Sequence, residues 1–209
     1  MQSCYITVLE GKTIQIVVKR SKFIGNICYA RNKDEAVDFI KHIRLKYKDA
    51  THNVPAYNIY SGGLTYYSDD KEPHATAGKP ILDVLKKEGV YDVCVVVTRY
   101  FGGVLLGTGG LVAAYSNSCK QLIKNATLAK STLCDCFNVL VDYKYVKKVE
   151  LVFSSYNVNV VEKVFTNYVE FKILVERIYS KKTRQNLVEV TNGEALIYFV
   201  KSLRERVKI

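Results

Sequence analysis

A glycine-rich segment between two apolar patterns constrains the fold of this chain more than any other feature. Five of the nine residues in 102–110 are glycine. Residues 93–97 precede it and form a β-branched apolar run, which predicts a strand buried on both faces. Apolar residues recur at helical spacing over 111–123 and predict an amphipathic helix. The segment is therefore expected to be either a tightly packed strand-to-helix corner or a binding surface.

The residues around this segment also suggest anion binding. A glycine-rich turn that opens a helix presents backbone N–H groups to an anion, and the helix dipole reinforces them. The spacing matches neither the Gly-x-Gly-x-x-Gly pattern nor the P-loop. Arg99, Tyr100 and Phe101 precede the glycines, and they can clamp a phosphate and stack on a base. The alternative is an ion pair from Arg99 to Asp69 or Asp70, with buried rings.

Composition places the chain among folded, soluble proteins. Of 209 residues, 48% are hydrophobic and 24% charged, and the net charge is +11, spread over both halves. A basic protein attracts polyanions, although lysine-rich composition alone is weak evidence. No stretch approaches the roughly 20 apolar residues of a membrane span, and the first residues lack a signal-peptide pattern. We therefore expect a cytoplasmic protein with no membrane association.

The six cysteines are expected to be reduced thiols, mostly buried. Cys134 and Cys136 stand too close together for a usual zinc site, and no second ligand pair accompanies them. The sequence therefore predicts no metal site and no cofactor.

The first half predicts a mixture of strands and helices. Residues 5–9 and 14–18 suggest a hairpin, and 23–30 a third strand. Asn32 and Glu35 form a capping box before an amphipathic helix. Further signals are Gly62-Gly63 as a two-residue hairpin turn between 55–60 and 64–67, and Pro80 at the start of a helix over 81–87.

The small polar stretch 126–132 suggests a domain boundary, so we expect domains at 1–130 and 131–209. The second half predicts the order βαββαβ, which is the split ferredoxin-like plan. Both domains belong to the α+β class. The expected elements are a strand at 136–143, a helix at 144–155, strands at 158–165 and 169–178, a helix at 180–191 and a strand at 195–200.

A second group of polar residues surrounds the loop 68–79. Carboxylates beside histidines can bind a divalent metal or perform acid–base catalysis, but no spacing here is specific for a metal. The same residues are also good turn formers, and we favour that structural interpretation. A metal-assisted hydrolase would need at least three of these side chains to converge. The group consists of His52, Asp69, Asp70, Glu72 and His74.

Several motifs, in this order, resemble those of the YigZ/IMPACT family. They include Ala50-Thr-His-Asn53, Val97-Thr-Arg-Tyr-Phe-Gly-Gly103 and Leu106-Gly-Thr-Gly-Gly-Leu111, and they span about residues 20–125. The resemblance implies an N-terminal domain with a ribosomal-protein domain-2-like fold. It also implies a C-terminal ferredoxin-like domain similar to one in elongation factor G. Two departures are Leu105 and Ala113, which replace family-typical basic residues.

The resemblance implies translational control through partner binding, so we expect a non-enzymatic protein that binds RNA, the ribosome or translation factors. No catalytic residue is assigned, and the sequence assigns no oligomeric state. Alternatives are the metal-assisted hydrolase, for which some relatives carry a peptidase label, and a pure protein-interaction module. The expected phosphate-binding surface consists of Arg99, Tyr100, Phe101, Gly102, Gly103, Gly107, Gly109, Gly110, Lys71 and Lys79.

Overall fold

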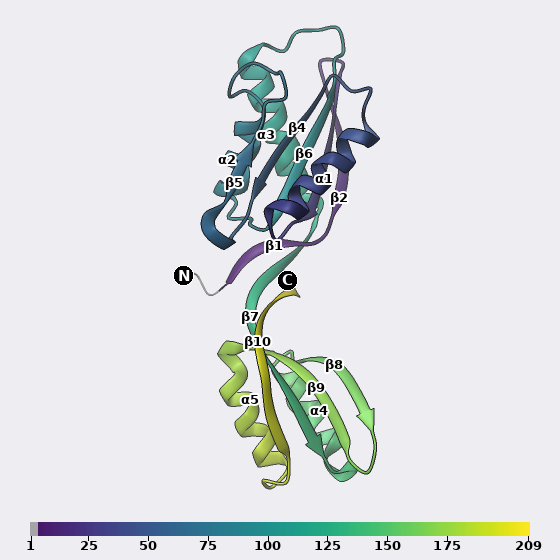
Figure 1. Ribbon diagram of the computed structural model, residues 1–209, viewed down its shortest axis with the longest axis vertical. Coiled ribbons are helices and arrows are strands. Elements are labelled where there is room, and N and C mark those ends of the chain that lie inside the picture. The colour runs from purple at the N-terminus through teal and green to yellow at the C-terminus, as the bar shows by residue number, and fades with distance from the viewer. Residues whose placement is uncertain (1–3) are drawn as a thin grey trace. The chain divides into compact units, whose positions relative to one another are not determined.

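The computed structural model describes residues 4–209, and they form two compact units of mixed helix and strand (Figure 1). The first unit comprises residues 5–130 with 206–209, and the second comprises residues 131–205 with Cys4. Each unit has its own hydrophobic core. The predicted α+β class is confirmed.

The first unit is built on an antiparallel five-stranded sheet in the order β2-β3-β6-β4-β5. Its central strand β6 carries the apolar run that precedes the glycine-rich segment. The strands are β2 (Lys12–Val18), β3 (Ser21–Tyr29), β4 (His52–Asn58), β5 (Thr65–Tyr67) and β6 (Val93–Tyr100).

Helices cover both faces of this sheet: α1 (Lys33–Lys46) lies on one face, and α2 (Gly78–Lys87) and α3 (Gly107–Asn125) lie on the other (Figure 1). Alternation along β6 explains the arrangement, because successive side chains point to opposite faces. Val95 and Val97 pack with α2 and α3, whereas Cys94 and Val96 pack with α1. The prediction of a strand buried on both faces is confirmed.

The capping box of α1 is confirmed with a small difference. Asn32 Oδ1 accepts a hydrogen bond from the Glu35 backbone N–H at 2.9 Å. Glu35 Oε2 accepts from the backbone N–H of Arg31, not of Asn32, at 2.8 Å. Asn32 thereby satisfies one backbone donor that the helix leaves unpaired, and Glu35 satisfies the backbone N–H of the residue just before the cap.

The predicted hairpin between residues 5–9 and 14–18 is wrong. β1 (Cys4–Glu10) pairs with β7 (Thr127–Val141), and β2 pairs with β3 instead. Val18 is paired with Ser21, so the connecting turn consists of Lys19 and Arg20, at φ 43° and 69°. Two left-handed residues are the signature of a type I′ turn. Apolar alternation marks a strand but does not choose its partner, and neither turn residue is the glycine that usually reveals such a turn.

One further turn and the start of one helix differ from expectation. A hairpin joins β4 to β5, but residues 59–64 connect the strands, and they include the short 3₁₀ turn Ser61–Gly63. Gly62 and Gly63, at φ 71° and 62°, lie inside that longer loop and do not form a two-residue turn. The helix predicted over 81–87 begins earlier, at Gly78, so Pro80 lies in its first turn. Gly107, Gly109 and Gly110 likewise lie in the first turn of α3.

The second unit confirms the predicted βαββαβ order. β10 pairs with β7, so the strand order is β10-β7-β9-β8, and the core contains residues of α4 and α5. The small polar stretch 126–132, which suggested a domain boundary, is largely part of β7. The remaining elements are the 3₁₀ turn Tyr143–Tyr145, α4 (Val146–Ser155), β8 (Asn159–Phe165), β9 (Val169–Glu176), α5 (Arg177–Val190) and β10 (Leu196–Lys208).

The β2–β3 turn supplies a test of this assignment. Replacing Lys19 by Asn together with Arg20 by Gly should raise the free energy of unfolding by about 0.5–1 kcal/mol, because both new residues adopt left-handed backbone readily. Urea unfolding followed by circular dichroism measures the change. Arg20→Ala is the control, and it should bring no gain, because alanine gains nothing at positive φ. A loss of stability in the Asn-Gly variant would contradict the type I′ turn.

Candidate functional site

A cavity of about 450 Å³ opens beside the glycine-rich segment, and we call it the α3 cavity. It lies among the ends of β4 and β6, the loop before α2 and the first turn of α3. Its apolar lining residues are Pro73, Phe101, Leu105, Leu106 and Leu111, and the others are Thr51, His52, Glu72, Arg99, Gly107 and Thr108.

The polar part of the α3 cavity contains a buried ion pair. Arg99 Nη1 donates to Glu72 Oε1 at 2.7 Å and to Oε2 at 3.0 Å. Arg99 is 5% exposed and Glu72 8% exposed, so the pair is largely removed from water. The Tyr115 hydroxyl donates to Glu72 Oε1 at 2.7 Å, and His52 Nε2 lies 3.7 Å from the same oxygen. Burial, and then the Glu72 charge, raise the pKa of Tyr115 well above its usual range.

Arg99 therefore does not present a free charge. Its guanidinium carbon lies 5.6 Å from the ring centroid of Phe23 and 5.6 Å from that of Phe101. The expected ion-pair alternative is present, but the partner is Glu72 and not Asp69 or Asp70. The sequence placed the partner within the right loop but could not choose the carboxylate, because the Asp69 and Asp70 carboxylates are taken up by backbone N–H groups that only the fold brings to them.

The two residues after Arg99 lie where the central strand β6 ends, and they are more exposed than Arg99. The Tyr100 hydroxyl donates to Asp49 Oδ1 at 3.0 Å, and Lys22 Nζ lies 5.2 Å from the centroid of its ring. Phe101 is 48% exposed, and its backbone N–H donates to Thr51 Oγ1 at 3.1 Å. An exposed aromatic ring at the mouth of a cavity is available to a ligand.

Four of the five predicted glycines have a reason within the fold, either close packing or a left-handed backbone. A Cβ atom on Gly102 would lie 2.1 Å from the Arg20 carbonyl carbon, so packing requires glycine there. Gly103 and Gly107 adopt φ of 80° and 70°, which glycine tolerates best. A Cβ atom on Gly110 would lie 3.2 Å from Leu106 Cβ, which is a tight contact.

Gly109 differs from the other four. It is helical, exposed and has no positive φ, and no atom lies within 4 Å of the place where its Cβ atom would be. Glycine in a helix is less favourable than alanine by about 0.5–1 kcal/mol. Neither packing nor backbone geometry within the described residues explains glycine at this position.

The carboxylates of the polar loop hold the loop together. The Asp69 carboxylate accepts hydrogen bonds from the backbone N–H groups of Ala75, Ala77 and Gly78 at 2.8, 3.1 and 2.9 Å. It thereby caps the start of α2, where a negative charge is favourable. The Asp70 carboxylate accepts from the Asn53 backbone N–H at 2.6 Å.

Of the two predicted histidines, only His52 approaches a loop carboxylate, that of Glu72, and neither converges with the carboxylates of Asp69 and Asp70. His52 Nδ1 lies 2.8 Å from the Asp70 backbone oxygen, and His74 is exposed. Within residues 4–209, no group of three or more His, Cys, Asp or Glu side chains could hold a metal ion. The convergence that a metal-assisted hydrolase needs is therefore not found in the described part of the chain.

The two predicted lysines lie outside the lining of the α3 cavity. Both are exposed, and Lys79 Nζ donates to Asp83 Oδ2 at 2.7 Å. Leu105, which replaces a family-typical basic residue, is 82% exposed and does line the cavity. The rim is consequently more apolar than the resemblance implied.

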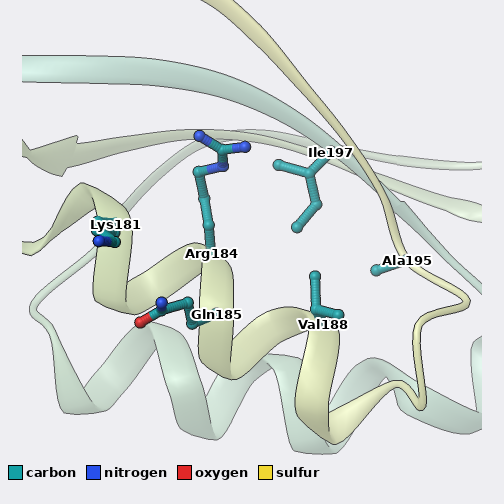
Figure 2. Close-up of a pocket in the computed structure, with 6 residues that line it drawn as sticks. All are labelled: Lys181, Arg184, Gln185, Val188, Ala195 and Ile197. Carbon is teal, nitrogen blue, oxygen red and sulfur yellow. The ribbon is translucent and has the colours of Figure 1, made fainter.

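A second cavity, of about 600 Å³, lies in the second unit between α5 and β10 (Figure 2). Arg184, Val188 and Ile197 are among its lining residues, and the Arg184 guanidinium carbon lies 5.7 Å from the Phe137 ring centroid. The sequence analysis placed no candidate residue here. The lining has no carboxylate, histidine or cysteine, so it offers cations and apolar contact but no acid–base pair.

The buried pair gives a stability prediction. Glu72→Ala should lower the free energy of unfolding by about 3–5 kcal/mol, because it leaves the Arg99 charge buried and unpaired. The double variant Glu72→Ala with Arg99→Met should recover at least about 1 kcal/mol of this loss. Tyr115→Phe is the control and should cost only about 1 kcal/mol. Urea unfolding measures all three, and a Glu72→Ala loss no greater than that of Tyr115→Phe would contradict the account.

Comparison with known proteins identifies the family. A family model described as the Impact N-terminal domain matches residues 19–123, which contain the α3 cavity. The IMPACT family member YvyE of Bacillus subtilis (strain 168) is 35% identical over 196 residues, covering 93% of this chain and 90% of that protein. The IMPACT family member YigZ of Escherichia coli (strain K12) is 27% identical over 184 residues, covering 87% and 90%.

A more distant relative and a solved structure are similar to this chain as well. The Protein IMPACT homolog of Dictyostelium discoideum is 34% identical over 107 residues, or 48% of this chain and 30% of that protein. A crystal structure described as that of a hypothetical protein shares the fold, with a TM-score of 0.62, 24% identity and coverage of 96% of this chain and 99% of that one. No helix among the described residues is long and apolar enough to cross a membrane. The matched domain and the relatives that extend over nearly the whole chain show that it belongs to the IMPACT family.

Proposed function

We propose that this chain is a non-enzymatic, translation-associated protein that binds RNA, free or in ribosomal particles, through the first turn of α3 and the α3 cavity. The resemblance to the IMPACT family supplies the link to translation. The observation that carries the binding surface is Gly109, the exposed helical glycine without an intramolecular reason.

An absent side chain at Gly109 leaves the backbone of the first helical turn open to a ligand. The first backbone N–H groups of a helix have no partner within it, and the helix dipole favours an anion beside them. α3 has 19 residues, and no described side chain caps its N-terminus at Leu106. A phosphate group can therefore approach Thr108 and Gly109 closely, which a methyl group on Gly109 would hinder.

Cations beside the segment support the same role. The backbone of Arg20 packs against Gly102, and Lys22 lies against the ring of Tyr100, so both exposed residues stand next to the glycine-rich segment. Neither was among the predicted site residues, because the β2–β3 turn that brings them there was not recognised. Cations at such positions would attract further phosphates of the same strand.

A glycine substitution tests the proposal. Binding of fluorescent single-stranded RNA and of ribosomal particles is measured across a salt titration for the parent and for Gly109→Ala. The variant should be more stable by about 0.5–1 kcal/mol, yet bind RNA roughly tenfold more weakly, because charge-assisted hydrogen bonds to phosphate are hindered. Asn117→Ala, on the exposed part of the same helix, should stabilise slightly and leave RNA affinity unchanged.

Equal RNA affinity of the parent and Gly109→Ala would remove the first turn of α3 from the proposal. Absence of RNA binding by the parent even at low salt would remove RNA binding itself. In that case a protein partner becomes the second candidate, favoured by the exposure of Leu105 and Phe101, at 82% and 48%.

Leu105→Lys separates these two candidates. A lysine beside bound RNA should tighten binding and increase the salt dependence by about one unit of slope. The same lysine should weaken a contact that depends on an apolar anchor. The binding assay described above, repeated with this variant on RNA and on ribosomal particles, gives the sign of the change.

A further inference from the structure

We propose that the α3 cavity holds one unstacked nucleobase, with the phosphate of the same nucleotide at the first turn of α3. This inference rests on the proposed function and identifies what the cavity recognises. It assigns to RNA binding a base-dependent component, beyond contacts to the backbone of the strand.

The size and lining of the α3 cavity fit a flat ring. Its volume of about 450 Å³ falls within the range of roughly 300–1,000 Å³ for small-molecule sites. Leu106 and Leu111 provide apolar walls, and the half-exposed ring of Phe101 stands at its edge. Single-stranded RNA is commonly recognised by unstacked bases that lie against aromatic and apolar side chains.

Arg99 offers an unused hydrogen-bond donor at this cavity. Nη1 is engaged by Glu72, and Nη2 lies 3.4 Å from Ser21 Oγ. Nε has no hydrogen-bond partner in the described residues, although Arg99 is only 5% exposed. Buried donors in folded proteins are normally paired. Because Arg99 lines the cavity, a carbonyl oxygen on the edge of a base is an acceptor of suitable chemistry.

The α3 cavity and the first turn of α3 differ in charge, which favours a ligand with an uncharged ring and a separate anionic group. Glu72 neutralises Arg99, so the cavity itself does not attract a phosphate. Gly107 and Thr108 line the same cavity and belong to the first turn of α3, where the helix dipole favours an anion. A nucleotide combines an apolar-faced ring with carbonyl or amino edges and a phosphate, and so matches both parts. An apolar protein side chain would fill the walls but leave the anion site unused.

A fluorescent reporter can test this directly, because the chain contains no tryptophan. Phe101→Trp places the only indole at the edge of the cavity, and the exposed side chain makes the substitution mild. Asn117→Trp is the matched control, because Asn117 is exposed on α3 and lies outside the lining of the cavity. Each protein is titrated with uridine and guanosine 5′-monophosphates, ribose 5-phosphate, inorganic phosphate and N-acetylphenylalanine amide. Fluorescent RNA binding by Phe101→Trp is measured in parallel.

We expect at least one nucleotide to quench Phe101→Trp saturably, at least about tenfold more tightly than ribose 5-phosphate, because only the nucleotide has a base. Asn117→Trp should not respond. Equal responses to nucleotides and ribose 5-phosphate would overturn the base pocket and leave a phosphate site. A response to N-acetylphenylalanine amide alone would also overturn it and assign the cavity to a protein side chain.

The same experiment separates this inference from the proposed function. If Phe101→Trp binds RNA but no nucleotide changes its fluorescence, the base pocket is wrong and RNA binding stands. If no nucleotide changes the fluorescence of Phe101→Trp and neither this variant nor the parent binds RNA, the proposed function is wrong, and the base pocket falls with it.

Discussion

The buried ion pair between Arg99 and Glu72 is the interaction on which the first unit's candidate site depends. Two charges removed from water are tolerated only when they are paired and hydrogen-bonded, so each fixes the other. Arg99 extends from the end of β6, Glu72 belongs to the loop before α2, and Tyr115 of α3 donates to the same carboxylate. One side-chain network thus joins a strand, a loop and a helix that are far apart in sequence.

The loop that carries Glu72 is held by its own carboxylates. Asp69 caps the first turn of α2, and Asp70 accepts from the backbone of β4. The Asp69 and Asp70 carboxylates, which the sequence offered as candidates for acid–base catalysis, are thus hydrogen-bonded to backbone N–H groups. The loop so held places Glu72 in contact with Arg99 and Pro73 in the lining of the α3 cavity. The polar loop therefore shapes one side of the α3 cavity, and the Asp69 and Asp70 carboxylates serve to hold the loop in place.

The glycine-rich segment serves several purposes at once, and only one of them points to a ligand. Gly102 permits close packing, and Gly103 and Gly107 permit left-handed backbone. Gly109 satisfies neither need, although glycine weakens a helix there. In sequence these residues form one glycine-rich run. Distinguishing their roles required knowing which atoms would surround a Cβ atom at each glycine, and at Gly102 those atoms come from a distant part of the chain.

The features that arise from local periodicity and capping could be predicted from the sequence alone. These are the buried strand at β6, the capping box of α1, the βαββαβ order and the α+β class, together with the family motifs. The partner of β1, the ion pair of Arg99 and the position of the α3 cavity became known only from the folded chain. The physical reason is that periodicity and capping act within a few residues, whereas strand pairing, buried charge pairing and cavities depend on which distant residues the fold brings into contact.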